Sequence, residues 1–322
     1  MNQLRKSKST FHNLREVNSL TYRGLIYKIK HRIRHKLEKY PNFQKFTTSL
    51  YLQYCSLTGF LHILPDYYII GFPKCGTTSL HEYLGRHPCV HTPVGKEFDF
   101  FDRLYSRGLN WYRVHFPFTF HKGLVKNILK KDFITGEATP RYIVHPHALQ
   151  RIKKTTPQAK FIILLRNPID RAFSHHAMNL DSDYEYLSFE DALKREKQRI
   201  NGRYEKMQKN ENYYSWDYDI YAYLEHSIYY PKIKRWFSEF PREQFLIIQT
   251  EEFEKDIQKT YKKVLQFLNL PEWKLDTIKF YKKRDYRGSK IDPSTRKQLA
   301  EFFRSHNERL HELLGVNFHW DE

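Results

Sequence analysis

The stretch "YYIIGFPKCGTTSL", residues 67–80, joins an apolar run to a glycine-bearing turn and then to residues that favour a helix start. A strand, a tight turn and a helix N-terminus in this order form an anion site, because free backbone N–H groups and the helix dipole point at the ligand. Gly71 and Gly76 are five residues apart, as in the phosphate loop GxxxxGK[ST]. Thr77 stands where that loop keeps its lysine, and the lysine lies inside the turn as Lys74. The pattern predicts a phosphate-binding loop and disfavours a magnesium-triphosphate site.

Apolar strands alternate with helical patterns from Asp66 onward. Wholly apolar strands separated by helices are typical of a parallel sheet that is covered on both faces. We expect strands at 67–71, 132–136, 160–165 and 245–250, and helices at 77–86, 145–155, from Pro168, 188–208, 217–239, 256–268 and 293–314. The charged, tyrosine-rich stretch 179–217 is interpreted as an insertion over one edge of the domain. The predicted fold class is therefore α/β with a central parallel sheet.

A second segment, "FIILLRNPIDRAFS", ends a buried strand in Arg166 and starts a helix at Pro168. Ser174 follows Arg166 by eight residues, so a strand-end guanidinium and a helix hydroxyl can converge on one phosphate. Arginine is suited to forked contacts with phosphate oxygens. Each segment alone has a plain reading, a capped helix or a surface ion pair. Paired with the first loop, the second segment is interpreted as the other half of one anion-binding site.

Charge and cysteine content narrow the class of protein. The formal net charge is +19, and residues 1–46 hold 12 Lys and Arg against two Glu, or +10 of that total. The excess favours an anionic partner and belongs mostly to the N-terminal extension. Three cysteines form no disulfide framework and no zinc-ligand spacing occurs, so we expect a reducing, cytoplasmic location and no metal. The first residues lack the apolar core of a secretory signal.

The N-terminal extension carries two distinct patterns. Residues 24–40 place Leu25, Ile29, Ile33 and Leu37 four apart among Lys and Arg, which predicts a basic amphipathic helix. This helix either docks on the domain or makes peripheral contact with an anionic membrane. Residues 46–65 are uncharged and long enough to span a bilayer, but their polar side chains favour a buried or interfacial helix. We therefore expect a basic helical extension over 1–65 and the main domain over 66–322.

With these motifs in place, the chain resembles the sulfotransferases that use 3′-phosphoadenosine 5′-phosphosulfate (PAPS). "PKCGTTSL" is similar to their 5′-phosphosulfate loop and "RNPIDRAFS" to their 3′-phosphate motif. "KEFDFFD", "GEATPRY" and the tail "IDPSTRKQLAEFFRSHNERLHELLGVNFHW" resemble the heparan sulfate glucosaminyl sulfotransferase branch. The resemblance covers about residues 66–320 and implies the P-loop, kinase-like three-layer fold, with a sulfotransferase domain at 66–322.

The resemblance also implies site residues and a reaction. Sulfuryl transfer would run from PAPS to a hydroxyl, or as second choice an amine, of a glycan, glycolipid or small metabolite, without a metal. Glu97 would be the base, and Lys74 would stabilise the leaving phosphate. The implied cofactor-binding residues are Lys74, Cys75, Gly76, Thr77, Thr78, Ser79, Arg166, Ser174 and, within "KKRDYRGSK" at 282–290, Arg287, with Arg284 and Lys290 as its alternatives.

Several positions keep alternative readings. Glu97 can instead form a structural salt bridge with Lys96, and Glu137 is a second carboxylate that fits a scaffold role better. Cys75 is read as a small loop residue, with a thiol of lowered pKa as the alternative. The resembled branch has histidine where Asp99 stands and lysine where Ala138 stands, so the resemblance does not carry a heparan-like acceptor with it.

Three further positions or sets depart from that branch or stay open. His176 replaces a tyrosine that is common after the 3′-phosphate motif. The aromatic set Tyr213, Tyr214, Trp216, Tyr218, Tyr221 and Tyr223 fits a sugar-stacking surface or a core-facing helix. The competing functions are an ATP-dependent kinase, disfavoured by the loop, and a basic membrane- or nucleic-acid-binding protein on an inactive scaffold. We expect no specific nucleic-acid partner.

Overall fold

The computed structural model describes residues 41–93, 95–278 and 290–320. The chain divides into two compact units between Phe60 and Leu61. The predicted boundary between residues 65 and 66 stays a prediction. The basic helix predicted at 24–40 lies outside the described residues.

The first unit contains helix α2, Pro41–Thr58, and the short 3-10 turn η1, Gly59–Leu61, follows it at the boundary between the units. The helix predicted within the uncharged stretch 46–65 therefore exists, but it begins before that stretch and ends seven residues before Pro65. Among the described residues, none of the helices is both long and apolar enough to cross a bilayer.

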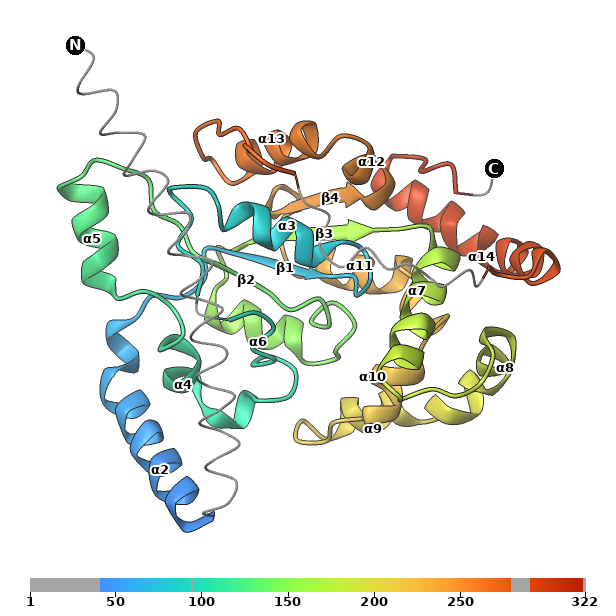
Figure 1. Ribbon diagram of the computed structural model, residues 1–322, viewed down its shortest axis with the longest axis horizontal. Helices are drawn as coiled ribbons and strands as arrows, with labels where there is room; N and C mark the ends of the chain where they lie inside the picture. Colours follow the sequence, from blue (N-terminus) through green and yellow to red (C-terminus); the bar gives the residue numbers. More distant parts are fainter. Residues whose placement is uncertain (1–40, 94, 279–289, 321–322) are drawn as a thin grey trace. The chain divides into compact units, whose positions relative to one another are not determined.

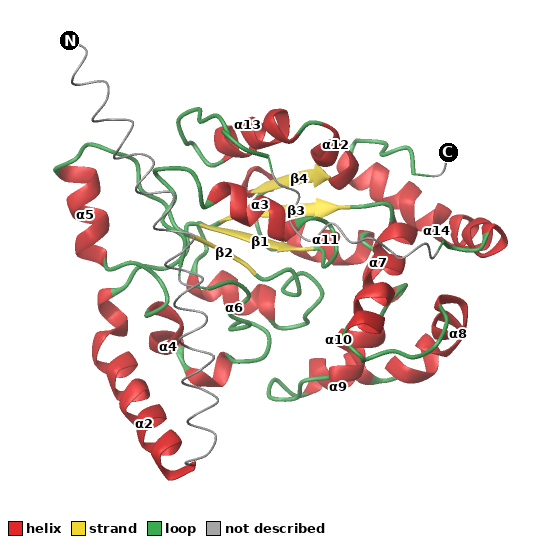
Figure 2. Cartoon of the chain, viewed as in Figure 1, coloured by secondary structure: helices red, strands yellow, loops and turns green. Residues whose placement is uncertain are grey.

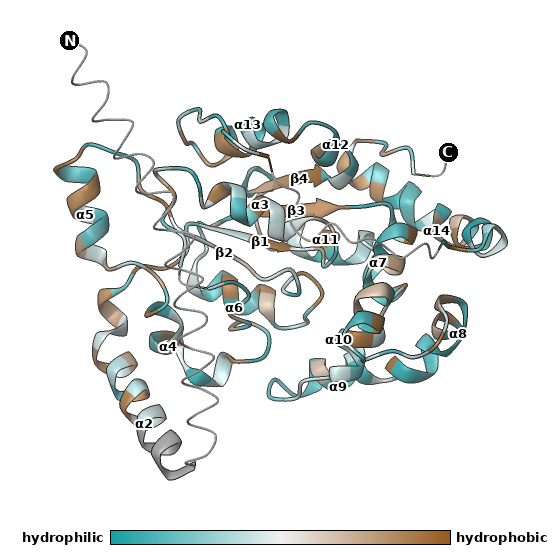
Figure 3. Ribbon diagram, in the orientation of Figure 1, coloured by the Kyte–Doolittle hydropathy of each residue, from teal (hydrophilic) through white to brown (hydrophobic). Residues whose placement is uncertain are grey.

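The second unit is built on a four-stranded sheet with the order β2-β1-β3-β4, and every pair of neighbours is parallel (Figure 2). The strands are β1 Tyr67–Gly71, β2 Gly136–Ala138, β3 Lys160–Leu165 and β4 Phe245–Gln249. The α/β class and three of the four predicted strands are confirmed. Strands β3 and β4 are among the most apolar elements in Figure 3, as expected for strands buried on both faces, whereas β1 and β2 are paler because they contain tyrosines and Glu137.

The strand predicted at 132–136 is wrong in its position. Ile134 makes only an isolated bridge to Val90, and β2 pairs with β1 from Gly136 to Ala138. A buried glutamate in its centre, Glu137, hid this strand from a reading based on apolar runs. Gly136 is required there, because a Cβ would overlap the ring of Tyr67 on the neighbouring strand.

Helices cover both faces of the sheet. The crossover from β1 to β2 puts α3, Thr77–Leu84, on one face, and α13, Ile257–Phe267, joins it after β4. The crossovers toward β3 and β4 put α6, Ala148–Thr155, and α11, Tyr230–Phe237, on the other face (Figure 1). This is the arrangement that right-handed parallel crossovers produce.

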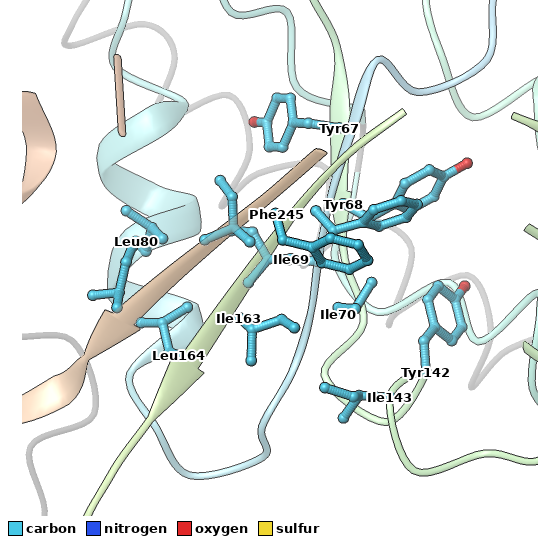
Figure 4. Packing of buried hydrophobic residues seen from close by; sticks show 14 of the residues in the cluster. Tyr67, Tyr68, Ile69, Ile70, Leu80, Tyr142, Ile143, Ile163, Leu164 and Phe245 are labelled. Carbon is cyan, nitrogen blue, oxygen red and sulfur yellow. The ribbon is translucent and has the colours of Figure 1, made fainter. Parts of the chain in front are cut away.

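The core lies between these layers. Figure 4 shows Ile69, Ile163 and Leu164 of the sheet with Leu80 of α3 on one side and Tyr142 and Ile143 on the other. All six side chains are fully buried. The sheet and its two helix layers therefore hold the strand ends, and the loops that leave them, in fixed positions.

The long helical patterns are divided in the structure. The pattern at 188–208 becomes α8, Phe189–Ile200, and α9, Arg203–Lys209, because Gly202 between them has φ +66°. The pattern at 217–239 becomes α10, Trp216–Tyr221, the 3-10 turn η3, Glu225–Ser227, and α11, which has a proline in its first turn. Helices α8, α9 and α10 gather near α7, Pro168–Asp181, away from the sheet (Figure 1).

The remaining helices complete the second unit. Helix α14, Pro293–Leu314, matches its prediction. The sequence patterns missed the short elements η2 Tyr105–Arg107, α4 Leu109–Arg113, α5 Thr119–Asn127, η4 Arg242–Gln244 and α12 Thr250–Lys255. Short helices carry too few turns for their periodicity to stand out.

Candidate active site

The loop between β1 and α3 has the backbone of an anion cradle. Lys74 and Gly76 have φ of +73° and +83°, and Gly76 is the N-cap of α3. No side chain caps this helix start, so its first N–H groups face the space in front of the loop. Thr250 Oγ1 donates to the Cys75 carbonyl at 2.9 Å and fixes the loop from the end of β4. The local structure predicted for residues 67–80 is confirmed.

Cys75 turns away from this space into the core. Its side chain is fully buried, and burial raises the pKa of the thiol to about 11. The alternative of a thiol with a lowered pKa is therefore wrong, because desolvation outweighs the neighbouring Arg171 and Arg166. The small-residue reading agrees with the structure.

The second predicted segment lies beside the first. Arg166 follows β3 directly, and its Nη1 donates to the Lys74 carbonyl at 3.5 Å. Asn167 caps α7 by accepting from the Ile169 N–H at 3.0 Å. Arg166 and Ser174 thus come from a strand end and the first turns of a helix, as the spacing predicted.

Arg171 on the same helix is a structural residue. It is fully buried, its Nε donates to Ser227 Oγ at 2.6 Å and its Nη2 donates to the Tyr223 carbonyl at 2.5 Å. These bonds tie α7 to the turn before α11.

A cavity of about 440 Å³ lies in front of the two segments. Of the ten predicted site residues, it is lined by Lys74, Gly76, Thr77, Thr78, Ser79, Glu97, Arg166 and Ser174. Cys75 does not line it, and Arg287 lies outside the described residues. The structure therefore brings eight of the ten predicted residues to one cavity.

Glu97 reaches the cavity and is also paired. Lys96 Nζ lies 3.0 Å from Glu97 Oε1 and donates to Thr78 Oγ1 at 2.6 Å, so the lysine links the carboxylate to the phosphate loop. Glu97 has φ +59°, a conformation that non-glycine residues adopt at a cost and mostly at functional sites. The salt-bridge reading is confirmed, and it leaves the carboxylate facing the cavity.

Glu137 has a different setting. It is fully buried and accepts hydrogen bonds from Thr139 Oγ1 at 2.6 Å, from Tyr142 OH at 2.7 Å and from Tyr112 OH. Burial raises its pKa to about 7, against these three bonds. It does not line the cavity, which agrees with the scaffold reading.

The sequence reasoning missed an arginine–carboxylate cluster in the cavity wall. Arg141 Nη2 lies 2.5 Å from Asp99 Oδ1, and its Nε lies 3.4 Å from Asp102 Oδ2 and 3.3 Å from Asp219 Oδ2. Arg103 pairs with the other oxygen of Asp99. Burial alone would lower the pKa of Arg141, but the three carboxylates raise it above its ordinary value. Arg141 comes three residues after β2, so a correct placement of this strand would have pointed to it as a second arginine beyond a strand end.

Aromatic side chains continue this wall. Tyr214 OH donates to Asp219 Oδ2 at 2.5 Å, and the Arg103 guanidinium lies 5.2 Å from the centre of the Tyr214 ring. Trp216 meets Tyr184 edge-to-face, with ring centres 5.0 Å apart. Tyr184, Tyr214 and Trp216 all line the cavity.

The other predicted aromatics pack inward. Tyr218 and Tyr223 are buried, and Tyr213 and Tyr221 pack against core clusters. The core-facing interpretation is therefore confirmed for these four side chains. Tyr214 and Trp216 lie at the cavity, and a sugar-stacking role for them stays a prediction.

Two buried histidines close the inner wall. His175 and His226 line the cavity with stacked rings whose centres are 6.1 Å apart. Burial and then the charge of Arg171 lower both pKa values well below the ordinary value, so both rings are neutral at pH 7. His176 points elsewhere, with Nε2 3.0 Å from the Leu187 carbonyl. No group of three His, Cys, Asp or Glu side chains suited to a metal ion occurs within 41–93, 95–278 and 290–320.

The chain is similar in sequence to characterised sulfotransferases. It is 24% identical to the membrane-associated sulfotransferase kil1 of Dictyostelium discoideum, over 90% of this chain and 72% of that protein. It is 29% identical to the heparan sulfate glucosamine 3-O-sulfotransferase 3B1 of Mus musculus, over 80% of this chain and 65% of the relative. The chain thus spans slightly less than two thirds of that relative's length.

The fold comparison agrees. The crystal structure of a sulfotransferase from Alicyclobacillus acidocaldarius superposes with a TM-score of 0.61 at 28% identity, covering 81% of this chain and all of that one. The family model described as "Sulfotransferase domain" matches residues 64–309, which include the Lys74 loop, the Arg166–Ser174 segment and the cavity wall. The chain belongs to the sulfotransferase domain family.

Proposed function

We propose that the protein transfers a sulfuryl group from PAPS to an acceptor hydroxyl, with an amine as the second choice. The observation that carries the proposal is the meeting of the Lys74 loop, the Arg166–Ser174 segment and Glu97 at one cavity. PAPS has a 5′-phosphosulfate and a separate 3′-phosphate, which matches two anion-binding segments on neighbouring strand ends. Each group would then have its own cationic side chain.

The residues present suit the donor. The uncapped N-terminus of α3, with Lys74 and the hydroxyls of Thr77, Thr78 and Ser79, would hold the 5′-phosphosulfate. Arg166 and Ser174 would hold the 3′-phosphate. Arg287 remains our proposal for a further contact.

The chemistry assigned to these side chains is a single in-line displacement. The acceptor oxygen attacks sulfur while the bond from sulfur to the 5′-phosphate oxygen breaks, and the acceptor proton passes to Glu97. Lys74 would stabilise the charge that develops on the leaving oxygen, without a metal. The products are a sulfate ester and adenosine 3′,5′-bisphosphate, so atoms and charge balance.

The acceptor class proposed is a glycan, a glycolipid or a small metabolite. Support for a glycan comes from relatives named for heparan sulfate glucosamine, and support for a lipid surface from the relative named membrane-associated. We further propose a cytoplasmic protein with peripheral membrane contact through residues 24–40.

Calorimetric titration with adenosine 3′,5′-bisphosphate tests the donor site. We expect binding by the wild type and a loss of at least about tenfold in affinity for Arg166→Ala, because a charge-assisted contact to phosphate contributes about 1.5–3 kcal/mol. Arg242→Ala, on the η4 turn outside the cavity, is the matched control and should bind like the wild type. A folded wild type that does not bind would contradict the proposal.

A further inference from the structure

We infer that the acceptor is an uncharged sugar, selected against carboxylated and sulfated glycans by the wall made of Arg141, its carboxylates and the aromatic rim. The aromatic rim is defined as Tyr184, Tyr214 and Trp216. The inference rests on the proposed function, because it names the acceptor of that same cavity.

The charges of the cavity wall carry the first step. Within the described part of the chain, Arg103 and Arg141 line the cavity in addition to Lys74 and Arg166, which face the donor. Both are held by carboxylates, Arg103 by Asp99 and Arg141 by Asp99, Asp102 and Asp219. The cluster thus pairs two positive groups with three negative ones, before Glu97 is added.

A polyanion needs cations that are not already neutralised. An acceptor carboxylate or sulfate beside Arg141 would lie next to Asp219 and Asp99, and repulsion by like charges discriminates against such a partner. Hydroxyl groups meet no such penalty, because they can donate to carboxylates and accept from guanidinium groups.

The aromatic rim carries the second step. Trp216 and Tyr184 are each 44% exposed although they are large aromatic side chains, and they meet edge-to-face. The C–H face of a pyranose ring is flat and apolar, so packing on such rings removes apolar surface from water. Tyr214 ties the rim to Asp219, which places stacking and hydroxyl-binding groups side by side.

The test compares neutral glycosides with a charged one, the glucuronide, which differs from the glucoside by a carboxylate in place of the 6-CH2OH group. The full chain with radiolabelled PAPS is offered hexyl β-glucoside, hexyl β-galactoside, hexyl N-acetyl-β-glucosaminide and the matched hexyl β-glucuronide. We expect kcat/KM for the best neutral glycoside to exceed that for the glucuronide by at least about tenfold. Equal or reversed preference overturns the inference, and so does absence of transfer to all neutral glycosides.

Two variants locate the selectivity. Asp219→Asn should raise the relative kcat/KM for the glucuronide by about fivefold or more, because it removes a carboxylate that would repel the carboxylate of the acceptor beside Arg141. Trp216→Ala should raise KM for neutral glycosides by about tenfold with little change in kcat, since it removes stacking that substrate and transition state share. Tyr186→Ala, an 81% exposed aromatic outside the cavity, is the matched control. Unchanged kinetics in both site variants would overturn the assignment.

Titration with adenosine 3′,5′-bisphosphate distinguishes a failure of the acceptor inference from a failure of the proposed function. If the wild type binds the bisphosphate but does not prefer neutral glycosides to the glucuronide, only the acceptor inference is overturned. Absence of bisphosphate binding overturns the proposed function instead.

A second observation independently supports an interaction surface. We propose that α5 and the residues after it dock on an anionic lipid bilayer. Phe120, Leu124 and Ile128 recur every four residues with 71%, 43% and 72% exposure, and Leu129 beside them is 52% exposed. Figure 3 shows apolar and polar residues side by side along α5.

The charges beside this stripe favour a bilayer. Lys126, Lys130 and Lys131 are exposed next to the apolar side chains, while Lys122 is paired with Asp66 at 2.9 Å. An exposed apolar stripe bordered by lysines has the composition of a helix that lies in an anionic interface.

Co-sedimentation of the full chain with vesicles checks this proposal. All proteins carry Lys28, Lys30, Arg32 and Arg34 replaced by Gln, which removes the contact proposed for residues 24–40. In this background we expect binding to phosphatidylcholine vesicles that contain phosphatidylserine, and a loss of at least about tenfold in partitioning for the double variant Phe120→Asp, Ile128→Asp. Phe302→Asp, at an exposed position of α14, is the control. Equal binding by the double variant, or none by the protein that carries only the Gln substitutions, overturns it, and the latter result would point to a protein partner.

Discussion

At the scale of single residues, the cavity depends on side chains held in unusual backbone conformations. Lys74 and Glu97, the two residues proposed for the chemistry, both have positive φ, as does Asp99, which pairs with Arg103 and Arg141. Such conformations persist only where the surroundings enforce them. The loop, the carboxylate and the Arg141 cluster are thus preorganised before any ligand arrives.

Removing the Lys74 ammonium tests its proposed role. Lys74→Ala should lower kcat by about 10²–10³, the usual loss when one group that stabilises a developing oxyanion is deleted. Initial rates with PAPS and a neutral glycoside measure it. Lys153→Ala, a half-exposed lysine paired with Glu239, is the control and should keep full turnover. Full turnover in Lys74→Ala would remove Lys74 from the chemistry.

Because the pKa of Glu137 is raised in the folded protein, we expect the free energy of unfolding to depend on pH. Burial raises its pKa from the ordinary 4.5 to about 7, so between these values the folded protein holds a proton that the unfolded chain has lost. The stabilisation is complete below the unfolded pKa and is lost as the pH rises through the folded one. Glu137→Gln does not titrate. The wild type should therefore lose up to about 3 kcal/mol relative to the variant between about pH 4.5 and pH 7.

Denaturant unfolding at several pH values gives these free energies. Glu301→Gln, on an exposed part of α14, should leave the wild-type profile unchanged. A difference that stays flat with pH would show that Glu137 does not hold its proton in the folded state.

At the scale of elements, the site depends on how closely β1 approaches the segment after β2. Gly71 ends β1, and a Cβ there would overlap the side chain of Ile143. The Ile143 N–H also donates to the Ile70 carbonyl at 3.0 Å, so neither chain can easily move away. The glycine therefore serves the packing beneath the phosphate loop.

Two glycine substitutions of the same chemistry should have opposite effects. Gly71→Ala should lower the free energy of unfolding by about 1–3 kcal/mol through overpacking. Gly123→Ala, within α5 and with open space where its Cβ would stand, should raise it by about 0.5–1 kcal/mol. Chemical denaturation of both variants measures their free energies of unfolding. Equal changes in the two variants would contradict the packing role assigned to Gly71.

At the scale of the second unit, the C-terminal segment packs behind the residues proposed to bind the donor. Trp320 stacks on Phe318 with ring centres 4.6 Å apart, and its carbonyl accepts from Asn167 Nδ2 at 3.2 Å. Tyr229 packs beside Trp320 and donates through its OH to the Arg166 carbonyl at 2.8 Å. The last described residues are thereby coupled to the arginine proposed for the 3′-phosphate.

Trp320→Ala should therefore reduce both stability and donor binding. Loss of this buried ring should lower the free energy of unfolding by about 3 kcal/mol, and the affinity for adenosine 3′,5′-bisphosphate should fall with it. Thermal unfolding and calorimetry measure the two effects. Trp216→Ala, which truncates a half-exposed ring, should leave the melting temperature nearly unchanged. A Trp320→Ala protein as stable as the wild type would refute the coupling.

Local sequence pattern alone was sufficient for the strands at 67–71, 160–165 and 245–250 and for the local structure of the Lys74 loop and the Arg166–Ser174 segment. Long apolar runs, glycine at a positive φ and proline at a helix start act over a few neighbouring residues. They can therefore be recognised from the sequence alone. Tertiary structure decided the rest. Whether Glu137 forms a strand, whether Cys75 faces core or cavity, and which carboxylates surround Arg141 depend on partners far away along the chain. Asp219 lies 78 residues from Arg141, and Thr250 lies 175 residues from Cys75. Burial and charge pairing exist only after folding brings such residues together, and they set the pKa values and the charge of the cavity wall.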